Sequence, residues 1–168
     1  MGPSGSGKTT LLNLLSQRAK LESQNCEMEG QVLINGHQLA RNDYAKVGAY
    51  VQQDDALMDI YTARELFDFA CRIRLGHDKA EAKKRVDSII ERLDLGACCD
   101  QMIGGWNRRG ISGGERRRVS IGYEMIMEPS ILLLDEPTSG LDSQSAKRIV
   151  KQLRSEAERG LAVCATIH

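Results

Sequence analysis

Residues 2–9 of the chain read Gly-Pro-Ser-Gly-Ser-Gly-Lys-Thr and match the pattern G-x-x-x-x-G-K-[S/T], which is typical of loops that bind phosphate. Backbone N–H groups in such a loop turn toward phosphate oxygens, so its side chains have to be small or absent. The pattern assigns Lys8 to the outer phosphates of a nucleotide and Thr9 to Mg²⁺. A flexible Gly/Ser linker is the alternative interpretation of the motif alone. The candidate nucleotide contacts are Gly2, Pro3, Ser4, Gly5, Ser6, Gly7, Lys8, Thr9 and Thr10.

Two carboxylates follow an apolar segment in the second half of the chain. Residues 131–134 read Ile-Leu-Leu-Leu and are followed by Asp135 and Glu136. A carboxylate at the end of a buried strand is unfavourable without a partner, and a Mg²⁺ ion beside Thr9 supplies one to Asp135. Glu136 is then placed to polarise the water that attacks a γ-phosphate. Taken alone, the segment also fits an ordinary junction between a strand and a loop.

A second candidate anion site lies at residues 112–115, Ser-Gly-Gly-Glu. Ser112 and Glu115 have the spacing of a capping box, which predicts the start of a helix. Gly113 and Gly114 leave the first turn of that helix without side chains, and its positive end attracts anions. One nucleotide needs only one phosphate cradle, so a second cradle favours a role toward a nucleotide held by another subunit. Alone, the motif also fits a capped helix after a glycine-rich loop.

Strand-like and helix-like segments alternate along the chain, which predicts an α/β fold with a mostly parallel core sheet flanked by helices. The segments expected to form strands are 31–34, 47–52, 131–134 and 161–167, with Asn35-Gly36 as a turn after the first. We expect one helix to begin near Lys8 and another to cover 143–159, ending at Gly160.

Two further helices are expected between these strands, and they predict a small helical subdomain at approximately 60–125. The first begins at the capping box of Thr62 and Glu65, and the second begins at Asp78. Helical spacing assigns an apolar face to each of them. The expected faces are Leu66, Phe69, Ala70 and Ile73 on the first, and Val86, Ile89, Ile90 and Leu93 on the second.

Composition limits the possible functions. The 168 residues suffice for one domain, and 23 Lys and Arg balance 23 Asp and Glu, which argues against a nucleic-acid partner. No apolar stretch approaches the roughly 20 residues of a membrane helix. We interpret the basic cluster as mostly solvated helix surface. It comprises Arg108, Arg109, Arg116, Arg117 and Arg118.

Along the chain the phosphate loop comes first, then Ser-Gly-Gly-Glu (112–115), then Ile-Leu-Leu-Leu-Asp-Glu-Pro-Thr-Ser-Gly-Leu-Asp (131–142). Motifs in this order resemble the nucleotide-binding domain of an ABC transporter, a P-loop NTPase. The resemblance implies an ATPase that uses ATP and Mg²⁺. It matches Gln53 to a glutamine that contacts Mg²⁺ and the membrane domain. It matches His168 to a histidine that contacts the γ-phosphate and acts in catalysis. Residues Ser139, Gly140, Leu141 and Asp142 match the D-loop, and Ser112, Gly113, Gly114 and Glu115 match the signature, which binds the partner subunit's ATP.

The segments Val-Gln-Gln-Asp-Asp (51–55) and Gly-Ile-Ser-Gly-Gly-Glu-Arg-Arg-Arg (110–118) are similar to the G, or white-type, subfamily of half-transporters. This similarity implies a second nucleotide-binding domain as partner, in a homodimer or a heterodimer. It also implies a membrane-spanning domain in the same full-length chain, with this domain on the cytoplasmic face. Members export lipids, sterols, pigments or drugs. We therefore expect residues 1–168 to be a partial domain that alone hydrolyses ATP poorly.

Other classes of function remain as alternatives. A soluble ABC ATPase of DNA repair or translation has the same motifs, although the G-type spacing and the neutral charge count against it. A non-hydrolysing regulatory module is the second alternative, and it is weakened by the intact Lys8, Asp135, Glu136 and His168. A P-loop kinase or GTPase is disfavoured, because neither needs the second cradle at 112–115.

Overall fold

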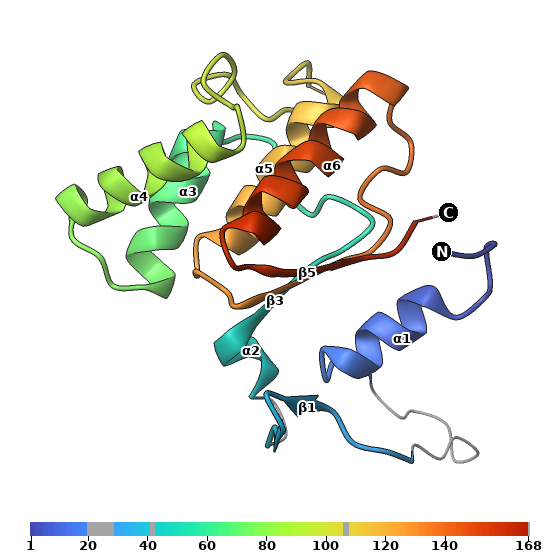
Figure 1. Ribbon diagram of the computed structural model, residues 1–168. Helices are drawn as coiled ribbons and strands as arrows, with labels where there is room; N and C mark the ends of the chain where they lie inside the picture. The colour runs from blue at the N-terminus through green and yellow to red at the C-terminus, as the bar shows by residue number, and fades with distance from the viewer. Residues whose placement is uncertain (20–28, 41–42, 106–107, 168) are drawn as a thin grey trace.

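The computed structural model describes residues 1–19, 29–40, 43–105 and 108–167, and its centre is a parallel sheet (Figure 1). The sheet contains β3 (Gly48–Val51), β4 (Ile131–Leu134) and β5 (Ala162–Ala165), in that order. Both pairings are parallel, with Val51 opposite Leu134 and Leu134 opposite Ala165. The predicted α/β class is confirmed, and the carboxyl ends of all three strands meet at one edge.

Alternation along the strands divides the apolar side chains between two cores. Leu132 and Leu134 join the larger core, while Leu133 belongs to the smaller one. On β3, Val51 faces the larger core and Tyr50 the smaller one. A strand with apolar residues on both faces has to be covered on both sides, as the continuous run 131–134 predicts.

Helices cover the two faces of the sheet, and Figure 1 shows α5 (Gly113–Met125) and α6 (Ser143–Glu158) on one side. On the other side α1 (Lys8–Leu15) packs through Leu12, which contributes to the smaller core with Tyr44 of the short helix α2 (Tyr44–Val47). The predicted helices at Lys8 and 143–159 are confirmed, and α6 is followed by Gly160 with φ 104°.

The first predicted strand is shorter than expected. Instead of 31–34, only β1 (Leu33–Ile34) forms, and it pairs antiparallel with β2 (His37–Gln38). Asn35 and Gly36 have φ values of 50° and 80°, as a two-residue hairpin turn with both residues left-handed requires. The predicted turn is therefore confirmed. The strand expected at 161–167 is also shorter, because only 162–165 pair within β5.

Two capped helices, α3 (Ala63–Arg74) and α4 (Lys79–Arg92), pack beside α5 (Figure 1). Capping boxes at Thr62 with Glu65 and at Asp78 with Glu81 begin them, as predicted. The face expected on α4 is confirmed, since Val86, Ile89, Ile90 and Leu93 are buried. A subdomain boundary at 60–125 stays a prediction.

The face expected on α3 is partly wrong. Phe69 and Ile73 are 46% and 69% exposed, whereas Phe67 and Cys71 are buried with Leu66 and Ala70. The side of α3 that is buried is the side that α4 and α5 contact. On α5, Gly122 allows this approach, because a Cβ there would lie 2.6 Å from Phe67 Cζ and 2.9 Å from Leu93 Cδ1.

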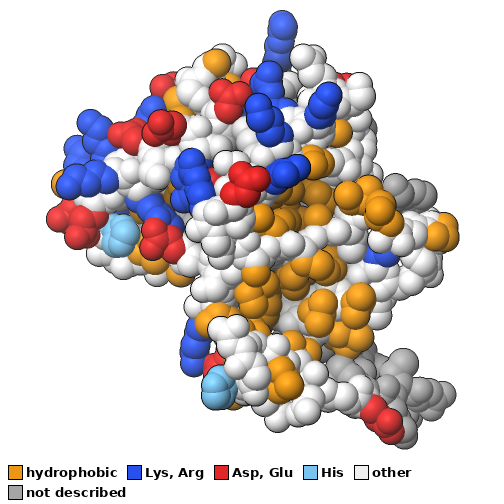
Figure 2. Space-filling model, in the orientation of Figure 1, with side chains coloured by type: hydrophobic (Ala, Val, Ile, Leu, Met, Phe, Trp, Pro, Cys, Tyr) orange, Lys and Arg blue, Asp and Glu red, His pale blue; other side chains and the backbone are white. Residues whose placement is uncertain are grey.

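The face of the molecule drawn in Figure 2 has separate apolar and charged regions. Figure 2 shows hydrophobic side chains gathered over β5 and toward α1, while charged side chains crowd over α3 and α4. Among the large apolar side chains of α1, Leu11 is 57% exposed. Within the residues that the structure describes, no helix has the length and apolar character to cross a membrane.

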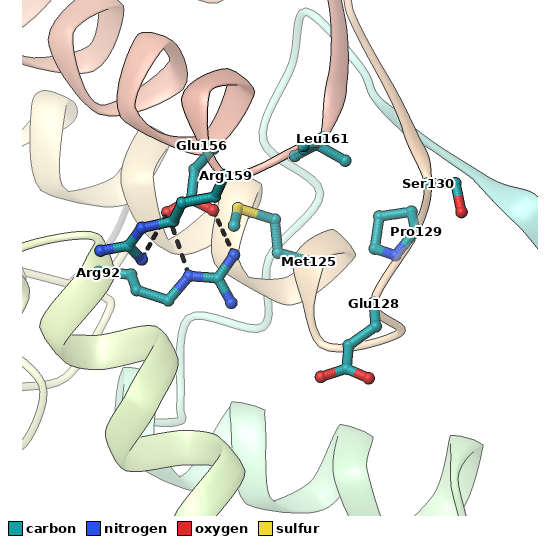
Figure 3. Close-up of a pocket in the computed structure, with 9 residues that line it drawn as sticks. Arg92, Met125, Glu128, Pro129, Ser130, Glu156, Arg159 and Leu161 are labelled. Carbon is teal, nitrogen blue, oxygen red and sulfur yellow. Dashed lines mark hydrogen bonds and ion pairs between the residues drawn. The ribbon is translucent and has the colours of Figure 1, made fainter.

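A pocket of about 300 Å³ lies at the amino ends of β4 and β5, beside Ser130 and Leu161. In its wall, Arg92 and Arg159 both point toward the carboxylate of Glu156, which is 2% exposed (Figure 3). The buried carboxylate is thereby neutralised within the wall. This cluster joins α4 to α6, at the end of the sheet opposite to Asp135.

Candidate nucleotide-binding site

The loop at residues 2–9 has the backbone of a phosphate cradle. Gly5 and Gly7 have φ values of 78° and 84°, and Gly7 directly precedes α1. Glycine adopts this left-handed conformation without the steric cost that a Cβ brings. The helix therefore begins at Lys8 with its positive end facing the loop, the arrangement in which backbone N–H groups bind anions.

A pocket of about 460 Å³ opens at this loop, at the carboxyl edge of the sheet. It collects predicted site residues from three separate parts of the chain. Its lining consists of Ser4, Gly5, Gly7, Lys8, Thr9, Thr10, Gln53, Glu136 and Ser139. The loop, the segment after β3 and the segment after β4 converge here because parallel strands end at the same edge.

Lys8 and Glu136 face each other in this pocket. The Lys8 ammonium donates to the carbonyl oxygens of Gly2 and Pro3 at 2.8 and 3.0 Å, and lies 3.3 Å from Glu136 Oε1. Gln53 Nε2 donates to the other carboxylate oxygen, Glu136 Oε2, at 3.3 Å. Glu136 therefore contacts both Lys8, which the loop pattern assigns to phosphate, and Gln53, which the resemblance assigns to Mg²⁺.

Glu136 has an unusual backbone, with φ 44° in the left-handed region. A residue with a Cβ pays about 1–2 kcal/mol for this conformation. The backbone is held in place by Thr166, whose Oγ1 accepts from Glu136 N at 2.9 Å. Backbone strain of this kind concentrates at functional sites, which agrees with a role for Glu136.

Thr166 also donates to Asp135 Oδ1 at 2.8 Å, so one hydroxyl holds both carboxylate residues. The motifs gave no indication of Thr166. The usable signal was its position directly after the strand 162–165, because residues that follow neighbouring parallel strands lie side by side.

Asp135 shares a second pocket with Thr9 and Gln53, of about 350 Å³. Their hydroxyl, amide and carboxylate oxygens are the hard ligands that Mg²⁺ prefers, and two or three of them suffice because phosphates and water complete its shell. Tyr50 OH donates to Asp135 Oδ2 at 3.4 Å, and burial raises the pKa of Tyr50 to about 12, so it remains a donor. The residues present fit a Mg²⁺ ion at this position.

The segment 112–115 begins α5 with the predicted capping box. Ser112 Oγ and Ser112 N donate to Glu115 Oε2 at 2.7 and 2.8 Å, and these bonds lower the pKa of Glu115. Gly114 is buried against α6: a Cβ there would lie 2.7 Å from Ser145 Oγ. Glycine at position 114 therefore allows α5 to pack against α6, and it also leaves the start of α5 without a side chain.

None of the signature residues 112–115 lines the cavity at Lys8 of the same chain. Ser139, at the start of the predicted D-loop, does line it, and Gly140 turns the chain with φ 71°. Asp142 caps α6 by accepting from Gln144 N and Ser145 N at 2.9 and 3.0 Å. Hydrogen bonding by the side chain and then the backbone of Ser145 lowers the pKa of Asp142. Leu141 lies close to Gly113. His168 lies outside the described residues.

The predicted solvation of the basic cluster is wrong for two of its five arginines. Arg117 and Arg118 are 4% and 3% exposed, whereas Arg108 and Arg109 are exposed. Arg118 donates to Asp94 O at 3.5 Å, and Arg117 contacts the chain after β3. Charge spacing alone did not reveal this burial, because it depends on which segments cover α5.

Comparison with known proteins agrees with the resemblance that the motifs carry. A family model described as "ABC transporter" matches residues 1–139. The whole chain is 48% identical to ABC transporter G family member 22 of Arabidopsis thaliana and 46% identical to ABC transporter G family member STR of Petunia hybrida. It spans 22% and 20% of the lengths of these two relatives.

The similarity and the geometry concern the same residues. The matched range 1–139 contains the loop at 2–9, Gln53, the segment 112–115 and the carboxylates at 135 and 136. Domains of this family bind ATP, and the pocket at Lys8 has the backbone and the charges that a triphosphate requires. The chain belongs to the ABC transporter family, whose nucleotide-binding domains are ATPases.

Proposed function

We propose that the chain is the ATP-hydrolysing nucleotide-binding domain of a G-type half-transporter. The observation that carries the proposal is the convergence of Lys8, Gln53 and Glu136 in one pocket, with contacts of 3.3 Å to each oxygen of Glu136. Lys8 and the loop amides bind the triphosphate, and Thr9, Gln53 and Asp135 would hold Mg²⁺. When bound, Mg²⁺ neutralises charge that develops on the phosphates. Glu136 accepts the proton of the attacking water.

Hydrolysis in this proposal belongs to a pair of nucleotide-binding domains. Residues 112–115 do not line the pocket at Lys8, and they form a capped helix start with an exposed Gly113. This arrangement supports a head-to-tail pair, in which each ATP is held between the phosphate loop of one subunit and the signature of the other. His168 of each subunit then contacts the γ-phosphate. ATP binding closes the pair and hydrolysis reopens it.

The pair works on a membrane domain that we expect in the same full-length protein, with this domain on the cytoplasmic face. The chain spans 15% to 24% of the lengths of its curated relatives, which are G family and white-brown proteins. The transported class that we propose is a lipid, sterol, pigment or drug-like molecule, moved outward, as the resemblance to the G subfamily implies. No role toward nucleic acid is proposed, in keeping with the neutral net charge.

The substitution Glu136→Gln in the full-length protein tests the proposed hydrolysis. It keeps the size of the side chain and removes the base, so the rate of phosphate release should fall by about 10²- to 10⁴-fold while ATP remains bound. Glu158→Gln is the matched control, because that carboxylate is 67% exposed on α6 and pairs only with Arg154 among the described residues. Undiminished turnover in Glu136→Gln would exclude Glu136 as the base.

A further inference from the structure

Arg117 of α5 is buried between α5 and the segment that follows β3. Its Nη1 donates to Gln52 O at 2.7 Å, and its Nη2 donates to Gln53 O. Nη1 also forms an ion pair with Asp55 Oδ1 at 3.0 Å, and Asp55 Oδ1 accepts no hydrogen bond from the described residues. One guanidinium therefore contacts three residues of a four-residue stretch.

Burial of these charges requires close pairing. A buried guanidinium is unfavourable unless carbonyls and a carboxylate satisfy it, and Arg117 is only 4% exposed. Burial raises the pKa of Asp55, and the charge of Arg117 acts against that rise. Ser120 and Arg116 of α5 also act to lower the pKa of Asp55. The segment 52–55 is thus held against α5 by mutually dependent charges.

The carbonyl contacts matter most for the site, because they fix the path of the backbone at Gln53. From this anchored position, the Gln53 side chain reaches Glu136 Oε2 at 3.3 Å. Arg117 itself does not line the pocket at Lys8. It is one helical turn beyond Gly113, so the helix that begins with the signature also carries the anchor of Gln53.

We propose that Arg117 is a positioning residue: its fork on the Gln52 and Gln53 carbonyls places the Gln53 side chain beside Glu136 and ties that placement to the position of α5. The catalytic part of this inference rests on the proposed function. Loss of the fork releases the segment 52–55 and misplaces Gln53, while the phosphate loop is untouched. The effect therefore appears in turnover and hardly in ATP binding.

The kinetic test compares Arg117→Met, Gln53→Ala and the double variant in the full-length protein. Arg117→Met should lower kcat by about tenfold to a hundredfold, as expected for a misplaced reacting group, with an almost unchanged KM for ATP. If Arg117 acts through Gln53, the double variant loses no more than the more impaired single variant. Losses that multiply, or an unchanged kcat in Arg117→Met, overturn the proposal.

Two further variants separate positioning from folding. Arg117→Lys keeps the charge but has one ammonium in place of the fork, so its kcat should lie between those of the wild type and Arg117→Met. Arg154→Met removes an arginine that is 81% exposed on α6 and should leave kcat unchanged. Simultaneous loss of ATP binding and turnover in both Arg117 variants assigns a purely structural role and refutes the inference.

Hydrogen exchange in the full-length protein without nucleotide distinguishes failure of this inference from failure of the proposed function. Amides of residues 52–57 should exchange faster in Arg117→Met than in the wild type, and those of α6 should not change. This readout does not depend on hydrolysis. Exchange at 52–57 equal to that of the wild type contradicts the anchoring, whereas turnover that survives Glu136→Gln contradicts only the proposed function.

Discussion

At the scale of single residues, the site is organised by hydrogen bonds that hold the reacting groups in unfavourable positions. Glu136 keeps a left-handed φ of 44° because Thr166 accepts from its backbone N–H. The same hydroxyl donates to Asp135, so both carboxylate residues depend on one side chain from the neighbouring strand end. Loss of a hydrogen-bond partner of a metal ligand typically costs about 10- to 100-fold in metal affinity or activity.

Removal of the Thr166 hydroxyl should therefore impair the site without disturbing the core. Thr166→Val leaves Asp135 Oδ1 without this donor and Glu136 N without its acceptor. We expect the Mg²⁺ concentration for half-maximal ATPase activity of the full-length protein to rise by about tenfold. Thr166→Ser keeps the hydroxyl and serves as the control. An unchanged Mg²⁺ dependence in Thr166→Val would show that Thr166 does not orient Asp135.

At the scale of elements, the start of α5 is fitted closely against α6. A Cβ on Gly114 would lie 2.7 Å from Ser145 Oγ and 2.8 Å from Ser145 Cβ. A Cβ on Gly113 would lie 3.6 Å from Leu141 Cδ2, an ordinary contact. Packing therefore requires glycine at position 114, whereas position 113 has space for a side chain.

This difference predicts opposite tolerances to alanine. Gly114→Ala should destabilise the full-length protein by about 1–3 kcal/mol through overpacking, which outweighs the helix propensity that alanine adds. The thermal unfolding midpoint should fall for Gly114→Ala and hold or rise for Gly113→Ala. The substitution Ser145→Gly removes the opposing atoms and should raise the midpoint of Gly114→Ala by more than it raises that of the wild type. Equal midpoints for the two alanine variants would argue against close packing at Gly114.

At the scale of the whole molecule, the proposed pair predicts complementation between two inactive variants. Lys8→Ala disables the phosphate loop. Gly113→Asp adds a negative charge to the signature at a position with space for a side chain. In a mixed pair, one ATP site combines the altered phosphate loop with the altered signature, and the other site combines the two unaltered segments. Each variant alone has no intact site.

Co-expression of the two full-length variants with different tags provides the measurement. If two copies pair head to tail, the mixed pair purified through both tags should recover up to about half of the wild-type ATPase activity, with one site of two intact. Pairs of Lys8→Ala alone and of Gly113→Asp alone should stay inactive. A mixed pair that is as inactive as these two controls would contradict a site shared between two copies of this chain.

The sequence by itself determined the features whose information is local. The phosphate loop occupies eight consecutive residues, and the capping boxes at Thr62, Asp78 and Ser112 each span a separation of three. Such motifs encode their own geometry, because the atoms that interact are close along the chain. The apolar run 131–134 likewise predicted a strand covered on both faces.

Only the tertiary structure decided which distant segments meet. Helical spacing did not distinguish the exposed Phe69 from the buried Phe67, because burial depends on the side from which α4 and α5 pack. The sequence predicted Arg117 to be part of a solvated basic run, but in the structure the segment 52–55 covers it. Thr166 reaches Asp135 across 31 residues of sequence through the pairing of β4 with β5. Contacts of this kind arise when strands align and helices cover them, so no local pattern contains them.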